Sequence, residues 1–460
     1  MTSIPVPSSD GMTSTAAPGV TAPSAFRYDG YELDPTRRSL TCHYSLGKQR
    51  FAEHISFGEG GDWESAGLER SAQLVFLLAG VSYYKTAAPA VVDLRETVVN
   101  PEELDLLRQF YVNGLGELAF RNGIDLSEVE FRATVRTVAP ASVTPAVRNP
   151  LIPFGGGMDS IVTVDTVKEH FENATLFITS QSGIRFGAIE AAATLTGLPV
   201  RRADRSIDDK VLRSAELGFL LGHVPVTGII SAIAVMAAVL YGHDSVVMSN
   251  EWSASEGNLV VDGRTVNHQY SKSASFEAAF RAASSSVIGN SIAYFSLLRP
   301  FSELRVAERF AQLTEYHPVF HSCNRAFHID PARRLDDWCG ECDKCCFIDL
   351  ILAPFLSPTQ LRAVFGGREP LSRPHLRDRF RRLLGTVSGA KPFECVGAIT
   401  ECRAALQLTA DRRGRAEDPL VRSLADELPE RLTRAEIGRL LAPLGNHCIP
   451  DGFAAEDLLV

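Results

Sequence analysis

Phe154-Gly155-Gly156-Gly157-Met158-Asp159-Ser160 is the stretch that decides the fold of this chain. A short apolar run, residues 151–154, precedes the glycines, and a helix-like stretch, residues 161–171, follows them. This order predicts a strand, a tight turn and a helix start, because glycine lets the backbone bend sharply. The first N–H groups of a helix lack partners within it and lie at the positive end of its dipole. The stretch therefore predicts a phosphate-binding turn.

No lysine follows the turn in the G-x-x-x-x-G-K-[ST] spacing, so it is not the loop that usually holds a γ-phosphate. It resembles the S-G-G-x-D-S pyrophosphate loop of ATP pyrophosphatases, which split ATP between its α- and β-phosphates. The departure is Gly155, where those enzymes usually have Ser, so a hydroxyl is lost but the backbone N–H remains. The alternative is an ordinary glycine turn of an α/β domain. The resemblance implies an ATP-binding loop made of Gly155, Gly156, Gly157, Asp159 and Ser160.

The chain has 460 residues, enough for two or three domains, and a formal net charge of −9, which argues against a nucleic-acid partner. Residues 1–25 are rich in Ser, Thr, Pro, Ala and Gly, and we expect them to be disordered. They lack the basic start and apolar core of a secretory signal, so we expect a cytoplasmic protein. The sequence gives no oligomeric state.

One apolar stretch, Val224 to Gly242, is just long enough to resemble a membrane span. It is rich in Ala and Gly, contains Ser and Thr, and lies between strand-like segments. Pro225 suits the first turn of a helix. We therefore expect a buried helix of an α/β core and no membrane insertion.

Strand and helix patterns alternate from residue 150 onward, which predicts a doubly wound parallel sheet with helices on both faces. The fold class we expect is α/β of the ATP-pyrophosphatase type. Short aromatic strands and two helical stretches before residue 148 predict a small N-terminal α+β lobe. The expected parts are a disordered tail (1–25), the N-terminal lobe (26–148), the nucleotide-binding α/β domain (149–320), and a cysteine cluster with a helical C-terminal region (321–460).

Ligands bind at the carboxyl ends of the strands in such sheets. Thr179 and Ser180 end one predicted strand, and Glu251 follows another, so we expect all three beside the glycine turn. Glu251 is a candidate magnesium ligand or base, and Lys272 in the following polar loop is a candidate phosphate or carboxylate partner. The alternative is a solvated loop. Cys395, next to Glu394, is a candidate for proton transfer or simply a packed thiol.

Four of the nine cysteines lie between residues 339 and 346, and three have C-x-x-C-x-x-C spacing. Closely spaced thiolates can bind one ion, so this spacing indicates a metal site before disulfides. Cys323 is the nearest upstream thiol for the fourth position, with His321 or His328 as substitutes. The predicted ligands are Cys323, Cys339, Cys342 and Cys345. Zinc is the first choice; an iron–sulfur cluster and cysteines that merely pack in a turn are the alternatives.

Further stretches resemble the MurL family of UDP-N-acetyl-alpha-D-muramoyl-L-alanyl-L-glutamate epimerases. They are SYYK (82–85), FGGGMDSIVTV (154–164), SNEWSAS (249–255), NHQYSKS (267–273) and FHSCNRAFHIDPARRLDDWCGECDKC (320–345). The resemblance implies an enzyme that converts the terminal L-Glu of UDP-MurNAc-L-Ala-L-Glu into D-Glu for peptidoglycan. It implies ATP and Mg²⁺ as cofactors and AMP and pyrophosphate as products.

A glycine turn of this kind suits such a reaction. A free carboxylate makes its α-proton hard to remove, because the enolate would carry a second negative charge. An acyl-adenylate removes the first charge, after which a base and an acid can invert the carbon. Glu251, Lys272 and Cys395 are the candidate catalytic residues. The alternative function is a pyrophosphate-loop enzyme that modifies a nucleobase or tRNA.

Overall fold

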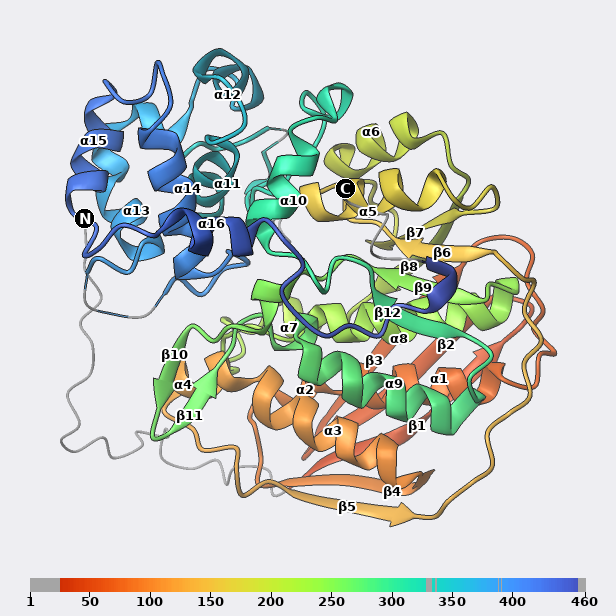
Figure 1. The fold of residues 1–460 in the computed structure, drawn as a ribbon. Coiled ribbons are helices and arrows are strands. Elements are labelled where there is room, and N and C mark those ends of the chain that lie inside the picture. Colours follow the sequence, from red (N-terminus) through yellow and green to blue (C-terminus); the bar gives the residue numbers. More distant parts are fainter. Residues whose placement is uncertain (1–24, 328–332, 336, 388, 390, 454–460) are drawn as a thin grey trace.

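The computed structural model describes residues 25–453 except 328–332, 336, 388 and 390, so the predicted tail (1–25) lies almost entirely outside the described residues. Its centre is a ten-stranded sheet with the order β12-β9-β6-β7-β8-β3-β2-β1-β4-β5 (Figure 1). The strands are β1 (Phe26–Asp34), β2 (Ser39–Leu46), β3 (Gln49–Phe57), β4 (Val91–Val99), β5 (Glu130–Val135), β6 (Pro150–Pro153), β7 (Thr175–Gln181), β8 (Val200–Ser206), β9 (Ser245–Met248) and β12 (Ala293–Ser296).

The sheet is mostly parallel, as expected. Strands β12, β9, β6, β7 and β8 are parallel to one another, while β1, β2 and β3 form an antiparallel meander. The N-terminal strands belong to the same sheet, because β3 pairs antiparallel with β8 from His54–Ser206 to Phe57–Ala203. A buried ion pair crosses this junction, with Arg205 Nε 2.6 Å from Glu53 Oε1. The boundaries at residues 148 and 320 stay predictions.

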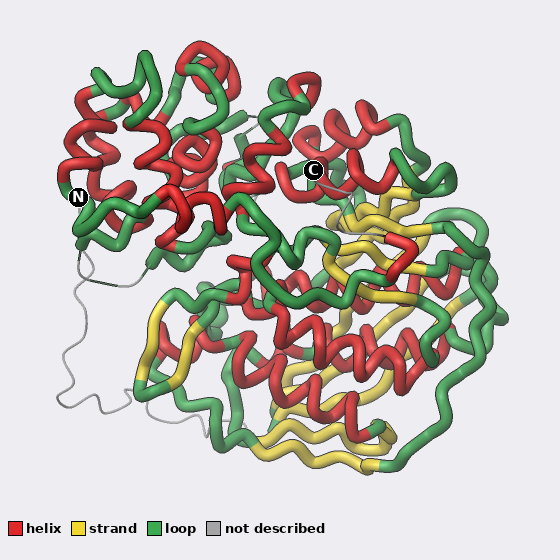
Figure 2. Tube along the Cα trace, viewed as in Figure 1, coloured by secondary structure: helices red, strands yellow, loops and turns green. Residues whose placement is uncertain are grey.

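Helices cover both faces of the sheet (Figures 1 and 2). Neighbouring strand residues point into two different cores: Ile152 packs with the helices of one face, and Leu151 packs with those of the other. The first face carries α5 (Met158–Lys168), α6 (Gly187–Thr196) and α10 (Glu303–Phe310). The second carries α1 (Leu68–Ala79), α2 (Val81–Tyr84), α3 (Pro101–Gly114), α4 (Gly116–Asn122), α8 (Val226–Tyr241) and α9 (Ala274–Ile288).

Helix α8 is the apolar stretch that could have been a membrane span. It ends at Gly242, whose left-handed backbone (φ 73°) lets its N–H bond to Ala238 O. Twelve of its residues are buried, and it packs along α1. Among the described residues, no helix combines the length and the apolar character needed to cross a membrane.

The C-terminal region is helical, as expected, and packs beside α10 (Figure 1). Its last segment returns toward the sheet, where Phe453 stacks on Phe171 at 4.2 Å between ring centroids. Its helices are α11 (Asp343–Leu352), α12 (Pro358–Val364), α13 (Arg377–Leu383), α14 (Ile399–Ala410), α15 (Pro419–Asp426) and α16 (Arg434–Leu440). The remaining elements are α7 (Asp209–Leu212), the hairpin β10 (Leu259–Val261) and β11 (Arg264–Val266), and the 3₁₀ turns η1 (Trp252–Ser255), η2 (Tyr270–Lys272), η3 (Thr314–Tyr316), η5 (Pro370–Ser372), η6 (Pro374–Leu376) and η7 (Asp451–Phe453).

Candidate active site

The glycine turn joins β6 to α5 in the strand–turn–helix order that the sequence predicts. Gly156 has a left-handed backbone (φ 72°), and a Cβ there would lie 2.8 Å from Ala188 O. Gly157 is the extended N-cap of α5, and a Cβ there would lie 2.9 Å from Ser322 Oγ. Only glycine fits at position 156 without strain, whereas a side chain at position 157 would displace the Ser322 hydroxyl. The turn therefore presents the first N–H groups of α5 at the carboxyl edge of the sheet.

The neighbouring parallel strands end at the same edge and carry buried polar atoms. Thr179 Oγ1 and Ser180 Oγ, at the end of β7, have no hydrogen-bond partner in the described part of the chain. Both residues line a cavity of about 240 Å³ together with Phe186. A water molecule or a polar ligand in this cavity would supply the partners that these hydroxyls lack.

A buried arginine positions the two polar loops that meet this edge. Arg299 is 3% exposed and pairs with Glu277 at 2.9 Å. Its guanidinium also donates to the carbonyls of Glu251 and Lys272, each at 2.7 Å. One side chain therefore fixes the backbone of both candidate residues.

Four acidic side chains meet at this position. Asp159 is on α5, Glu251 follows β9, Glu303 begins α10, and Glu401 is on α14. Glu303 donates its backbone N–H to Glu401 Oε1 at 3.1 Å. Asp159 Oδ1 and Glu251 Oε2 are buried and have no partner among the described residues.

Lysines oppose these carboxylates. Lys344 Nζ lies 3.6 Å from Glu303 Oε1 and also interacts electrostatically with Asp159. Lys272 interacts with Glu251, Asp159 and Glu303. The site thus combines several buried carboxyl groups with two ammonium groups.

The pKa values show how crowded the acidic groups are. Burial and the charge of Glu251 raise the pKa of Asp159 to about 6. Burial raises the pKa of Glu401 to about 7 and that of Glu303 well above its usual range. Burial opposes the charge of Lys272, but Cys395 and Glu251 together raise its pKa above the ordinary value. A cation bound here would relieve the repulsion between the carboxylates.

The four predicted cysteines converge, since all the sulfur atoms of Cys323, Cys339, Cys342 and Cys345 lie within 4.8 Å of one another. Cys345 Sγ is 3.4 Å from Cys342 Sγ and 3.6 Å from Cys339 Sγ. The backbone N–H of Cys342 points at Cys339 Sγ, 3.4 Å away. Four thiolates around one zinc ion stand about 3.8 Å apart, given a Zn–S bond of about 2.3 Å. The cluster fits a tetrahedral ion.

The cysteine cluster is joined directly to the glycine turn. His321, two residues before Cys323, donates its backbone N–H to Gly156 O at 3.3 Å. Lys344, between Cys342 and Cys345, reaches the carboxylates. The alternative ligand His321 is outside the sulfur cluster, and His328 lies outside the described residues.

Cys395 is paired with a histidine rather than with its neighbour Glu394, whose carboxylate accepts a hydrogen bond from Asn324. The histidine is His268, and its Nδ1 lies 2.5 Å from Glu117 Oε2. Burial opposes the thiolate, but Lys272 and then the His268 hydrogen bond lower the pKa of Cys395 to about 7. Cys395 and Glu117 together raise the pKa of His268 to about 9 despite its burial.

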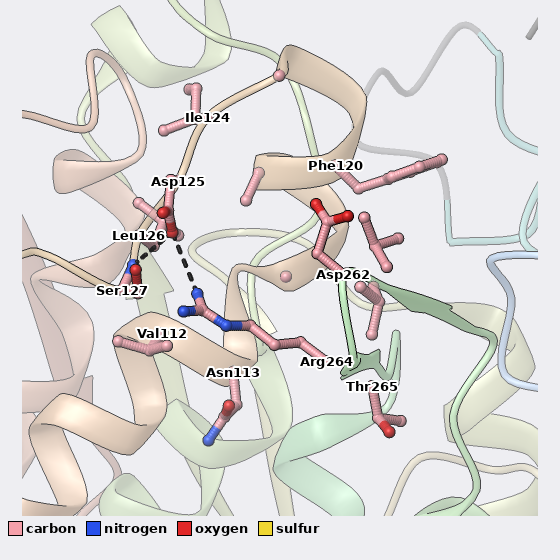
Figure 3. Close-up of a pocket in the computed structure, with 15 residues that line it drawn as sticks. Val112, Asn113, Phe120, Ile124, Asp125, Leu126, Ser127, Asp262, Arg264 and Thr265 are labelled. Carbon is pink, nitrogen blue, oxygen red and sulfur yellow. Dashed lines mark hydrogen bonds and ion pairs between the residues drawn. The ribbon is translucent and has the colours of Figure 1, made fainter. Parts of the chain in front are cut away.

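A pocket of about 470 Å³ lies between α3, α4 and the β10–β11 hairpin (Figure 3). Arg264 crosses it to Asp125 at 3.1 Å, and Asp125 also accepts the Ser127 N–H. Gly116, which precedes Glu117, lines this pocket.

Comparison with known proteins identifies the family. A model of the MurL N-terminal domain matches residues 19–297, and a model of the MurL C-terminal domain matches residues 319–437. The chain belongs to the MurL family. A protein of Salinispora tropica is 38% identical over 445 residues, 94% of each chain, and one of Xanthomonas oryzae is 37% identical over 436 residues, 93% of this chain and 95% of its own.

Both of these MurL relatives, and a third from a Micromonospora species (36% identical over 446 residues, 94% of this chain and 97% of its own), are named UDP-N-acetyl-alpha-D-muramoyl-L-alanyl-L-glutamate epimerase. No solved structure matches the chain. The MurL resemblance predicted from the sequence is confirmed.

The MurL structure brings most of the predicted site residues to one edge. The glycine turn, Asp159, Glu251 and Lys272 surround a common charged region, with Cys395 beside Lys272. Ser160 instead donates its hydroxyl to Gly157 O at 2.9 Å. Only its backbone N–H is then left to contribute to the phosphate-binding turn.

Sequence reasoning missed several members of the site, namely Glu117, His223, Glu303, Lys344 and Glu401. They lie on helices or loops far from the glycine turn in the chain. Only Lys344 carried a usable signal, because it lies between two cysteines of the predicted metal site.

Proposed function

We propose that this chain is an ATP-dependent epimerase that converts the terminal L-Glu of UDP-MurNAc-L-Ala-L-Glu into D-Glu, releasing AMP and pyrophosphate. The observation that carries the proposal is the glycine turn at the start of α5, with the unpartnered carboxylate oxygens of Asp159 and Glu251 beside it. The names of the three relatives supply the substrate.

ATP activation explains why a nucleotide site belongs in an epimerase. The glutamate carboxylate attacks the α-phosphorus of ATP, the bond to the β-phosphate oxygen breaks, and pyrophosphate leaves. The acyl-adenylate has no negative charge on its carbonyl group, so its α-proton is far more acidic. After inversion, water attacks the acyl carbon and releases AMP together with the D-product.

Different residues at the carboxyl edge of the sheet suit the different parts of ATP. The backbone N–H groups of Gly157 and the first turn of α5 suit the pyrophosphate oxygens. The cavity beside Thr179 and Ser180 suits the adenosine, because its hydroxyls lack partners and Phe186 offers an aromatic wall. Lys272 and Lys344 neutralise phosphate charge.

Magnesium fits the carboxylates of this edge. Asp159 Oδ1 and Glu251 Oε2 are hard oxygen ligands, buried and unpartnered in the described structure. When bound, Mg²⁺ would offset the charge of the phosphate oxygens. It would also offset the charge of Glu251, which, after burial, raises the pKa of Asp159.

Zinc fits the four cysteines. The sulfur separations match one tetrahedral ion, whereas a cluster of several irons would hold its ligands farther apart. The zinc would be structural, since all four positions are filled by protein thiolates. It would fix the segment that bonds to Gly156.

The test combines UDP-MurNAc-L-Ala-L-Glu, ATP and Mg²⁺ with the purified enzyme. We expect D-Glu in the hydrolysed product by chiral chromatography, with AMP and pyrophosphate in equal amounts. Asp159→Asn should lose both products by about 100-fold or more, because it alters the phosphate region. Glu169→Gln, at the exposed end of the same helix, should match the unaltered enzyme. ADP and phosphate as products, or inversion without ATP, would refute the proposal.

A further inference from the structure

Cys395 is held in place by hydrogen bonds on both sides of it. Asn258 Nδ2 donates to Pro392 O at 2.7 Å, and Gln269 Nε2 donates to Val396 O at 3.2 Å. Asn258 also accepts the backbone N–H of His268 at 2.8 Å. The segment around Cys395 and the segment around His268 are therefore joined as one rigid unit.

Within this unit the side chains of Glu117, His268 and Cys395 interact in that order. Glu117 Oε2 lies 2.5 Å from His268 Nδ1, and the imidazole interacts electrostatically in turn with the Cys395 thiol. Glu117 is 6% exposed and is anchored through its other oxygen by Arg121 Nε at 2.5 Å. A carboxylate that orients an imidazole beside a thiol is the arrangement that activates cysteine in enzymes.

The surroundings favour a charged thiolate–imidazolium pair. The rings of His223 and His268 are tilted by 37°, with 4.0 Å between their centroids. Burial and the charge of His268 lower the pKa of His223 to about 3, so His223 stays neutral. Cys395 is partly exposed. The other charged groups facing the pair are Arg121, Lys272, Lys344, Glu394 and, beside His223, Lys85.

The unit adjoins the proposed adenylation site. Lys272 interacts with Cys395 and also with Asp159 and Glu251. Lys344 likewise interacts with both Cys395 and Asp159. The thiol and the carboxylates of the proposed adenylation site therefore share the same two ammonium groups.

We propose that Cys395, oriented by His268 and Glu117, is the general base that takes the α-proton of the adenylated glutamate. This assignment rests on the proposed function. The Cα–H bond breaks, the S–H bond forms, and the electron pair moves to the carbonyl oxygen as an enolate. A solvent-derived proton then forms the new Cα–H bond on the opposite face, and Cys395 releases its proton to water. His268 and Glu117 are positioning residues.

The first experiment follows the reaction in heavy water, reading deuterium at the glutamate α-carbon and AMP release separately. Cys395→Ser should lose deuterium incorporation by about 100-fold or more, while AMP release falls far less. Cys448→Ser, an exposed cysteine far along the chain, should behave as the unaltered enzyme. Equal loss of both readouts, or undiminished deuterium, would overturn the role of Cys395. Absence of AMP release from the unaltered enzyme would instead overturn the proposed function, and the role with it.

The second experiment needs neither ATP nor substrate. The rate of Cys395 alkylation by iodoacetamide, followed by peptide mass mapping, should be half-maximal at about pH 7. Glu117→Gln should move this midpoint to a higher pH. Glu117→Asp, which keeps the carboxylate, should leave the midpoint close to that of the unaltered enzyme. A midpoint near that of an ordinary thiol in the unaltered enzyme would overturn the pairing.

Two further outcomes would also count against the proposal. A substrate acyl group recovered on Cys395 would make it a nucleophile and not a base. A second metal ion per chain that is lost in His223→Ala would mean that Glu117, His223 and His268, whose ligand atoms lie within 4.8 Å of one another, bind a cation instead.

Discussion

Replacing Gly156 by alanine tests the geometry of the glycine turn most directly. The residue has φ 72°, which costs an L-residue about 1–2 kcal/mol. The new Cβ would also lie 2.8 Å from Ala188 O and 3.0 Å from Ile189 Cα. Both are backbone atoms of α6 and cannot rotate away, so overpacking adds about 1–3 kcal/mol. The expected loss is about 2–5 kcal/mol in all.

Thermal unfolding would show this loss. At roughly 2.1 cal/mol/K per residue, the described chain has an unfolding entropy of roughly 0.9 kcal/mol/K, so Tm should fall by about 2–6 °C. Substrate-dependent AMP release should fall by about 100-fold or more, because a shift of about 1 Å misplaces the phosphate-binding N–H groups.

Gly155→Ala is the matched control. A Cβ at Gly155 would have no atom within 4 Å, and the backbone of Gly155 is not left-handed. The Tm of Gly155→Ala should therefore stay within about 1 °C of that of the unaltered protein. Equal Tm values for the two variants would refute the argument, since they would show that Gly156 is not held against α6.

Three further predictions concern other parts of the molecule. Cys342→Ser should reduce bound zinc from about one ion per chain to near zero by elemental analysis, with a lower Tm; a metal-free, equally stable unaltered protein would contradict the site. Burial raises the pKa of Glu401 from 4.5 to about 7, so the unaltered protein loses stability as the pH rises through that range. Glu401→Gln cannot lose a proton there, so its Tm relative to the unaltered protein should improve between about pH 5 and about pH 8. A Tm difference that does not change with pH would contradict the shift. Arg205→Met should cost about 3–5 kcal/mol by denaturant unfolding, because it leaves Glu53 buried and unpaired, and adding Glu53→Met should recover most of this loss; a double variant as unstable as the single one would contradict the pairing.

The sequence by itself determined the local elements and the family. The Gly155–Ser160 turn predicted a strand, a turn and a helix start, and β6, the turn and α5 follow in that order. Such signals are local, because the left-handed φ of Gly156 and the N-cap of α5 depend on a few adjacent residues. The C-x-x-C-x-x-C spacing is local in the same way, and it identified three sulfurs that meet.

Tertiary structure alone decided which distant segments share the site. Pairing of β3 with β8 joined the N-terminal meander to the parallel strands, although either edge could have faced solvent. Glu117 meets His268 across 151 residues, and Cys395 joins them from a third segment. No periodicity or spacing encodes such contacts, because they depend on how helices and loops pack over the sheet. The sequence makes Cys395 only one of several candidate catalytic residues. The fold then brings an imidazole and an ammonium group close enough to lower the pKa of its thiol.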